Sequence, residues 1–366
     1  MTTPIDTERR LVAIFAADVE GYSRLMGADE VGTLQGLTHR RAILDGLIGS
    51  HRGRIANTAG DSVLAEFGSA VDAVQCAVAA QETLAGANAG QSPDRHINYR
   101  IGIHVGDVVV KRGDLFGDGV NIAARLEGVA EPGGICLSDD AYRQVRGKIE
   151  MSCDDMGLQT LKNIAEPMRA WRMRVGGSGL SAVRNASMGA TRRLAAILVA
   201  DVVGYSRLLS NDGANAQVQL DALRHKLIQL NITKHSGRLF KATGDGFFAE
   251  FASVVQAVKC AIAIQSGVEH EASGFGDTRK LRLRIGIHFG DVMAVGDDLI
   301  GDGAYIAARL EGISAAGGIS ISRAVHDQVR DWIDVEFEDK GEINIALGNI
   351  TRLVHVFAFS ATNRIA

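Results

Sequence analysis

The sequence has few cysteines, and no two of them are spaced as a redox motif. Its four cysteines are Cys76, Cys136, Cys153 and Cys260, and none belongs to a CxxC pair. Cys76 and Cys260 fall inside apolar stretches with helical periodicity, where a cysteine usually behaves as a small buried hydrophobe. Redox chemistry is therefore not expected from these residues.

Long apolar runs and an excess of basic residues are also missing. The first ten residues contain no apolar core of a secretion signal, and no run approaches the ~18 apolar residues of a membrane span. The formal net charge is −4, whereas a protein that binds duplex nucleic acid usually presents a basic face. These absences predict a cytoplasmic protein with neither a membrane nor a nucleic-acid partner. They leave a nucleotide open as a ligand, because a bound metal can neutralise its phosphates.

The sequence contains one module twice. Residues 117–128 recur as residues 301–312, and the two stretches differ only at Val120/Ala304 and Asn121/Tyr305. A domain-sized repeat period is too long for a solenoid, so the repeat predicts two fused homologous domains, as the length of 366 residues also favours. We expect the domains at residues 9–175 and 192–359. Residues 176–191 between them are rich in Gly and Ser and are predicted to form a flexible linker.

The same order of patterns runs through both copies. In the first copy, residues 11–17 form a continuous apolar run typical of a buried strand, and residues 29–48 have helical periodicity. Residues 54–67 read as two strands around a tight turn at Gly60-Asp61. A further helix and a strand at residues 97–110 follow. The order βαββαβ predicts an α+β domain, with an antiparallel sheet and helices on one face. His104 and His288 lie on strand patterns among apolar residues and are expected to be structural.

A pair of aspartates recurs at equivalent positions. Asp18 and Asp201 close the first strand of each copy, and Asp61 and Asp245 lie in the hairpin turns. If the first strand is paired beside the hairpin, both carboxylates reach the same edge of the sheet. Such oxygen sites suit Mg²⁺ or Mn²⁺, and two such ions serve an in-line displacement at phosphorus. Turns often contain Gly-Asp for local reasons, but the presence of the pair in both copies favours the metal site.

Three ordered motifs, residues 15–22, 57–61 and 114–125, resemble the class III adenylate/guanylate cyclase catalytic domain. The resemblance covers nearly all of both copies. It implies two ferredoxin-like, palm-type domains that form an intramolecular head-to-tail pseudo-dimer, so that the chain is expected to be monomeric. It also implies composite sites, two Mg²⁺ or Mn²⁺ ions in each active site, and a nucleoside triphosphate substrate.

The resemblance assigns roles to individual residues of the first copy. Metal binding falls to Asp18 and Asp61, recognition of the base to Asp114, and contact with the transition state to Asn121 and Arg125. Contact with the triphosphate falls to Lys162. Asn57 stands where the family's base-reading lysine belongs. Its amide can present either its oxygen or its NH₂ group and is expected to discriminate bases poorly.

The second copy retains and loses other members of the set. It keeps metal-binding Asp201 and Asp245, base-reading Lys241 and Asp298, and Arg309. Tyr305 replaces the asparagine, and Gly348 replaces the triphosphate lysine.

Pairing across the copies gives two unequal sites. Site one combines Asp201 and Asp245 with the first copy's Asn57, Asp114, Asn121, Arg125 and Lys162, and we expect it to be the better catalyst. Site two combines Asp18 and Asp61 with Lys241, Asp298 and Arg309, and is expected to be degenerate. ATP is the expected substrate, with GTP and pyrimidine triphosphates as alternatives.

Two other functions compete with this interpretation. The departures at Asn57, Tyr305 and Gly348 would also suit a catalytically weak or inactive nucleotide-binding regulatory module, although the four retained metal aspartates disfavour it. A diguanylate cyclase shares an acidic hairpin, but its Gly-Gly-Asp-Glu-Phe signature is absent.

Overall fold

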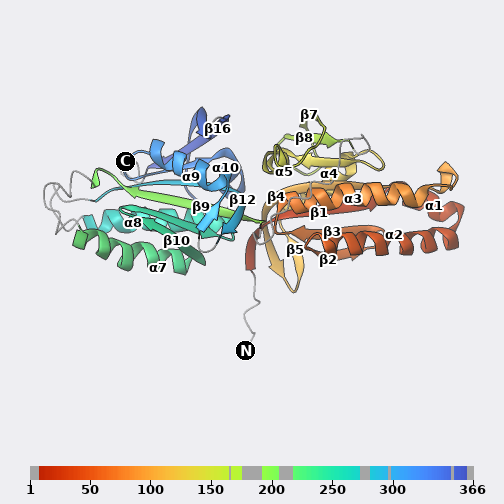
Figure 1. Cartoon of the computed structure of the whole chain (residues 1–366), viewed down its shortest axis with the longest axis horizontal. Coiled ribbons are helices and arrows are strands. Elements are labelled where there is room, and N and C mark those ends of the chain that lie inside the picture. The colour runs from red at the N-terminus through yellow and green to blue at the C-terminus, as the bar shows by residue number, and fades with distance from the viewer. Residues whose placement is uncertain are drawn as a thin grey trace. The chain divides into compact units, whose positions relative to one another are not determined.

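The computed structural model describes residues 8–164, 166–174, 192–205, 217–272, 281–295, 298–347 and 350–360. Its contacts divide the chain into a first unit, Met1–Gly189, and a second unit, Ala190–Ala366 (Figure 1). The predicted linker at residues 176–191 lies outside the described residues, as does Gly348.

The first unit has the predicted order of strands and helices. Its strands are β1 (Glu8–Val19), β2 (Gly53–Ala59), β3 (Ser62–Phe67), β4 (Tyr99–Lys111), β5 (Asp114–Phe116), β6 (Ile135–Ser138), β7 (Cys153–Gln159) and β8 (Met168–Met173). Its helices are α1 (Tyr22–Ala28), α2 (Glu30–Ser50), α3 (Ala70–Asn88), the 3₁₀ helix η1 (Pro93–Arg95), α4 (Asp118–Val129) and α5 (Asp139–Val145).

The second unit repeats this order. Its strands are β9 (Arg192–Val202), β10 (Gly237–Thr243), β11 (Gly246–Phe251), β12 (Leu283–Val295), β13 (Asp298–Ile300), β14 (Gly318–Ser322), β15 (Glu338–Leu347) and β16 (Ile350–Ser360). Its helices include the π-helix η2 (Arg224–Ile228), α7 (Gln229–Lys234), α8 (Val254–Ala272), α9 (Asp302–Ile313) and α10 (Arg323–Val329). Among the described helices of either unit, none is both long and apolar enough to cross a membrane.

The predicted α+β fold is confirmed, and its sheet is predominantly antiparallel. The strand order is β2-β3-β1-β4-β6-β8-β7 in the first unit and β10-β11-β9-β12-β14-β16-β15 in the second, with β5 and β13 paired to β4 and β12. One pair in each sheet is parallel, namely β4 with β6 and β12 with β14. A parallel pair needs a crossover connection, which α4 and α9 supply.

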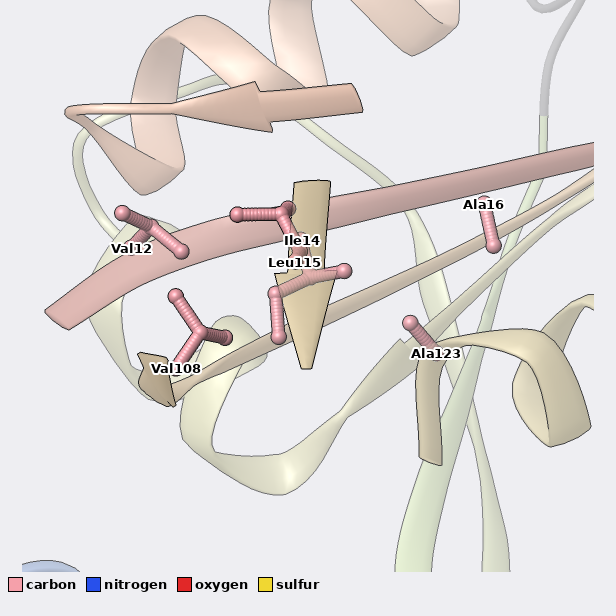
Figure 2. Close-up of a cluster of buried hydrophobic side chains, with 6 residues drawn as sticks. All are labelled: Val12, Ile14, Ala16, Val108, Leu115 and Ala123. Carbon is pink, nitrogen blue, oxygen red and sulfur yellow. The ribbon is translucent and has the colours of Figure 1, made fainter. Parts of the chain in front are cut away.

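Helices cover both faces of the sheet, so the expectation that they lie on one face is wrong. Ile14 of β1 belongs to a buried cluster that includes Ala123 of α4 (Figure 2). The next residue, Phe15, points to the opposite face, where it contacts Phe67. A Cβ atom on Gly53, beside that phenylalanine, would also meet Ile48 of α2. The apolar run of β1 is continuous because both of its faces are buried.

The two hairpins that carry acidic turns form as predicted. β2 and β3 pair up to Ala59 and Ser62, which leaves Gly60 and Asp61 as the turn. Gly60 and its counterpart Gly244 both have φ of 60°, a left-handed conformation that glycine adopts without strain. β3 also pairs with β1, so the turn lies beside the end of β1.

Helix α4 lies directly on strand β4, and α9 lies on β12 in the same way. A Cβ atom on Gly102 would come within 2.2 Å of the carbonyl oxygen of Ala123, and one on Gly286 within 2.1 Å of the backbone nitrogen of Glu311. No side chain separates helix from strand at these points. The sheet therefore fixes the position of the helix that carries the predicted transition-state residues.

The histidines and cysteines predicted to be structural have structural environments. Nδ1 of His104 lies 2.9 Å from the hydroxyl of Ser138, and burial lowers the pKa of this histidine to about 4. Nδ1 of His288 lies 2.8 Å from the hydroxyl of Ser322. Cys76 and Cys260 are buried, which raises the pKa of each thiol to about 12.

Candidate functional site

Two aspartates of the first unit meet at one edge of its sheet. Asp18 is the penultimate residue of β1, and Asp61 lies in the turn between β2 and β3. Oδ2 of Asp61 accepts a hydrogen bond of 3.2 Å from the backbone N–H of Val19. Burial raises the pKa of Asp61, and hydrogen bonding with Asp18 and its negative charge raise the pKa further. Such close like charges favour the binding of a cation.

The second unit repeats this pair. Asp201 lies near the end of β9, and Asp245 lies in the turn between β10 and β11. Burial raises the pKa of Asp245, the N–H of its own backbone lowers it, and the charge of Asp201 raises it. The predicted meeting of two carboxylates thus occurs within each unit.

The partners of the two pairs differ. The hydroxyl of Ser62 donates to Oδ1 of Asp18 at 2.8 Å, whereas the equivalent residue of the second unit is Gly246, which has no side chain. Asp201 instead accepts a hydrogen bond of 3.0 Å from Nη2 of Arg284. The equivalent distance from Arg100 to Asp18 is 3.6 Å, which is too long for a hydrogen bond.

Sequence reasoning missed an arginine–glutamate pair behind each carboxylate pair. Nε of Arg100 lies 3.1 Å from Oε1 of Glu127, and Nε of Arg284 lies 3.1 Å from Oε1 of Glu311. Burial and the nearby aspartates raise the pKa of each glutamate to about 7, against the lowering effect of the arginine. The signal was present, since Glu127 and Glu311 lie in the repeated stretches 117–128 and 301–312, and Arg100 and Arg284 begin a second repeated pair, residues 100–108 and 284–292. Only the fold shows that they meet.

The described residues contain no group of three or more His, Cys, Asp or Glu side chains that could hold a metal ion. The aspartate pair of each unit offers two carboxylates. This number fits Mg²⁺, which usually takes one or two protein carboxylates and completes its octahedron with waters and substrate phosphates. Mn²⁺ accepts the same oxygen ligands.

The two predicted base-recognition residues of the first unit contact each other. Nδ2 of Asn57 donates to Oδ2 of Asp114 at 2.9 Å, and Oδ1 of Asn57 accepts from the backbone N–H of Thr58 at 2.6 Å. In this orientation the amide oxygen faces the backbone and the NH₂ group faces Asp114. The group presents its remaining N–H as a donor.

A bulge in the strand places Asn57 and its counterpart Lys241. The β2–β3 register shifts between Ile55 and Asn57, and the β10–β11 register shifts between Leu239 and Lys241. Such a bulge re-aims the side chain that follows it. Strands β10 and β13 contact each other, and β13 begins at Asp298, whose side chain lies outside the described part of the structure.

The predicted phosphate-contacting residues of the first unit also come together. Asn121 and Arg125 are four residues apart on α4 and so share one face of this helix. Nε of Arg125 donates to the carbonyl oxygen of Lys162 at 3.1 Å. Lys162 lies in the connection between β7 and β8 and is exposed.

The second unit has a different arrangement at these positions. Nη2 of Arg309 donates to the hydroxyl of Tyr305 at 2.9 Å, and the guanidinium carbon lies 5.2 Å from the centroid of the tyrosine ring. β15 and β16 stay paired up to Leu347 and Ile350, whereas the β7–β8 pairing ends at Gln159 and Met168. The loop that carries Lys162 is thus replaced by a longer hairpin.

Both units match the same protein family. Residues 6–173 and 191–358 each match the family described as Adenylate and Guanylate cyclase catalytic domain.

Individual relatives match a stretch no longer than one unit. A Rhizobium meliloti (strain 1021) protein named "Putative adenylate cyclase 3" is 48% identical over 164 residues, which are 44% of this chain and 28% of that protein. A Streptomyces coelicolor adenylate cyclase is 33% identical over 140 residues, or 37% of this chain and 34% of that protein. The chain therefore matches about a third of the length of these relatives. The crystal structure of an adenylate/guanylate cyclase/hydrolase from Silicibacter pomeroyi is 37% identical, with a TM-score of 0.43 over 46% of this chain and 98% of its own.

Proposed function

Because the chain belongs to the adenylate and guanylate cyclase catalytic domain family in both of its units, we propose that it converts a nucleoside triphosphate into the 3′,5′-cyclic monophosphate and pyrophosphate, with ATP as the main substrate. The observation that carries the proposal is the division of side chains between the units. The second unit offers the proposed metal pair, Asp201 and Asp245, with Arg284 hydrogen-bonded to Asp201. The first unit offers the linked Arg125 and Lys162.

We infer that these halves combine in site one. The two units would then act as an intramolecular head-to-tail pair, with domains at residues 9–175 and 192–359. The linker of residues 176–191 could span roughly 20–25 Å as a flexible coil, which permits such a pairing. A disulfide between cysteines introduced at the Asp245 turn and on α4 near Arg125 tests it. Failure of this disulfide to form within one chain would count against the pair.

The chain's residues divide the chemistry of cyclisation. Two Mg²⁺ or Mn²⁺ ions held by Asp201 and Asp245 would supply charge neutralisation and a more acidic ribose 3′-hydroxyl. The 3′-hydroxyl gives up its proton to water and its oxygen bonds to the α-phosphorus. The bond from the α-phosphorus to the oxygen bridging the β-phosphate breaks, and pyrophosphate leaves. Asn121 orients the ribose, Arg125 offers its terminal nitrogens to charge on the α-phosphoryl group, and Lys162 holds the pyrophosphate.

The base is recognised by Asn57 and Asp114. The remaining N–H of Asn57 can donate to N1 of adenine, and Asp114 can accept from the exocyclic amine. Cytosine offers the same kind of acceptor and amine as adenine, and guanine can be recognised if its ring binds in a shifted position. GTP and pyrimidine triphosphates are therefore the alternative substrates.

Site two, with Asp18, Asp61, Lys241, Asp298 and Arg309, is proposed to be degenerate. It retains base recognition but has Tyr305 at the asparagine position. Loss of one donor to a developing charge costs roughly 10²–10³ in rate by analogy with oxyanion holes.

A turnover assay with the full chain tests the proposal. ATP, GTP, CTP and UTP are each incubated with Mg²⁺ or Mn²⁺, and products are identified by mass spectrometry. We expect 3′,5′-cyclic AMP as the main product. Nucleotide binding without any cyclic product would support the rival function, a nucleotide-binding regulatory module.

A further inference from the structure

The homologous arginines of the two units are held by different partners. Nε of Arg125, the guanidinium nitrogen nearest the aliphatic part of the side chain, donates a hydrogen bond to the backbone carbonyl oxygen of Lys162. No acceptor in the described part of the chain bonds its two terminal nitrogens. The two terminal nitrogens, which together can bind an anion in a bidentate manner, are therefore available.

Arg309 is held at the opposite end of its guanidinium. Its terminal Nη2 donates to the hydroxyl of Tyr305, and the guanidinium carbon lies over the tyrosine ring at 5.2 Å from the centroid. The two residues are four positions apart on α9, where side chains lie next to each other. One tyrosine therefore supplies both a hydrogen-bond acceptor and a π face to this cation.

We propose that Tyr305 is a positioning residue that clamps Arg309 and thereby withholds it from a phosphate group. Tyr305 is then more than a missing asparagine, because it engages the neighbouring cation directly. The connection to phosphate rests on the function proposed above, whereas the clamp itself is a property of the second unit alone.

The clamp is weak enough to be released by substitution. Tyr305 is 42% exposed, so its replacement should not disturb the core. An exposed cation–π contact and one hydrogen bond together correspond to roughly a tenfold effect on binding. A phosphate must compete with both contacts before it can bind Arg309.

Chemical labelling measures the clamp without any nucleotide. The full chain is treated with phenylglyoxal, which modifies arginine, and the labelling rates of Arg309 and Arg125 are followed by peptide mass spectrometry. Tyr305→Phe keeps the ring and removes the acceptor, and Tyr305→Leu removes both. We expect the labelling rate of Arg309 to be lowest in wild type, higher in Tyr305→Phe and highest in Tyr305→Leu, with a total rise of about threefold or more. The labelling rate of Arg125 should stay unchanged. Equal rates at Arg309 in all three proteins would overturn the clamp.

Binding then tests its consequence. In an Asp201→Ala background, which disables site one, the affinity for 3′-deoxy-ATP with Mn²⁺ is measured by calorimetry. Tyr305→Leu should tighten binding by roughly tenfold and Tyr305→Phe by less. If only Tyr305→Asn tightens it, the absent asparagine is the cause and the clamp is overturned. If no protein binds or converts a nucleotide, the proposed function fails, while the labelling still decides the clamp.

A mirror variant gives a matched control. Asn121→Tyr places tyrosine four residues before Arg125 in the first unit. Labelling of Arg125 should slow, while that of Arg309 stays the same. Labelling of Arg125 that is unaffected by the new tyrosine would show that this spacing does not produce a clamp.

Discussion

The guanidinium of Arg284 joins Asp201 to Glu311. Its Nη2 donates to Oδ2 of Asp201 at 3.0 Å, and its Nε lies 3.1 Å from Oε1 of Glu311. A charged hydrogen bond of this kind orients the carboxylate before any ligand arrives. In the first unit the carboxylate of Asp18 is held by the hydroxyl of Ser62 instead. The two proposed metal pairs therefore begin from different arrangements.

Substitution of the metal aspartates should separate the two sites. Asp201→Ala or Asp245→Ala should lower cyclisation to background, because only the proposed site one would join two carboxylates to Asn121, Arg125 and Lys162. Asp18→Ala, the matched change in the other unit, should retain most of the activity. Cyclic nucleotide formed per minute is the measurement. The opposite ranking would move the chemistry to site two.

A lysine at position 57 should sharpen the choice of base. Asn57→Lys offers a charged donor next to Asp114, and a charge-assisted hydrogen bond is worth about 1.5–3 kcal/mol. The ratio of kcat/KM for ATP over GTP should therefore rise about ten- to a hundredfold, as measured by competition in one reaction. Asn57→Ala is the control and should lower kcat/KM for both nucleotides. An unchanged ratio would mean that residue 57 is not at the base.

The close approach of helix to strand should make Gly286 intolerant of any side chain. A Cβ atom there would lie 2.2 Å from the carbonyl oxygen of Ala307, so Gly286→Ala must displace α9. We expect a loss of about 3 kcal/mol or more in the free energy of unfolding, at the upper end of the cost of overpacking. Urea titration measures it.

Gly46→Ala provides the comparison for that experiment. Gly46 lies within α2, and a Cβ atom there meets nothing within 4 Å. This substitution should be neutral or stabilise the protein by up to about 1 kcal/mol, because alanine favours a helix. Equal losses for both glycines would contradict the packing argument.

Burial of His104 should make stability depend on pH. The pKa of this histidine is lowered from 6.5 to about 4, so below pH 6.5 the unfolded chain takes up a proton that the folded chain does not. The contribution to stability is complete above pH 6.5 and is lost as the pH falls toward 4, by about 1.4 kcal/mol per pH unit. Urea unfolding of wild type and His104→Gln at pH 5, 6 and 7 should show the steeper loss in wild type. Parallel curves would refute the assignment.

The order of elements could be predicted because local sequence determines it. The residue types at Gly60 and Asp61 by themselves predict a turn, and the apolar run of β1 by itself predicts a buried strand. The second layer of helices could not be predicted in this way. An apolar run gives no alternation from which to learn that Ile14 and Phe15 point to opposite faces of the sheet and that both faces are covered.

The candidate site was predictable in its residue types and less so in its contacts. Asn57 and Asp114 meet as the resemblance implied, but the orientation of the amide depends on the backbone N–H of Thr58. Arg100 and Glu127 were missed because residues 27 positions apart meet only through the packing of α4 on β4. Contacts of this kind follow from tertiary structure rather than from sequence spacing.

The direct backbone contacts at Gly102, between β4 and α4, and at Gly286, between β12 and α9, limit how the two copies could diverge. A helix that touches the backbone of its strand has no freedom to slide or tilt, so within residues 114–128 and 298–312 the copies differ only by single side chains on a constant backbone. Residues 114–128 and 298–312 should therefore be interchangeable cassettes. A chain with these segments swapped should keep its fold and carry tyrosine at position 121 and asparagine at position 305.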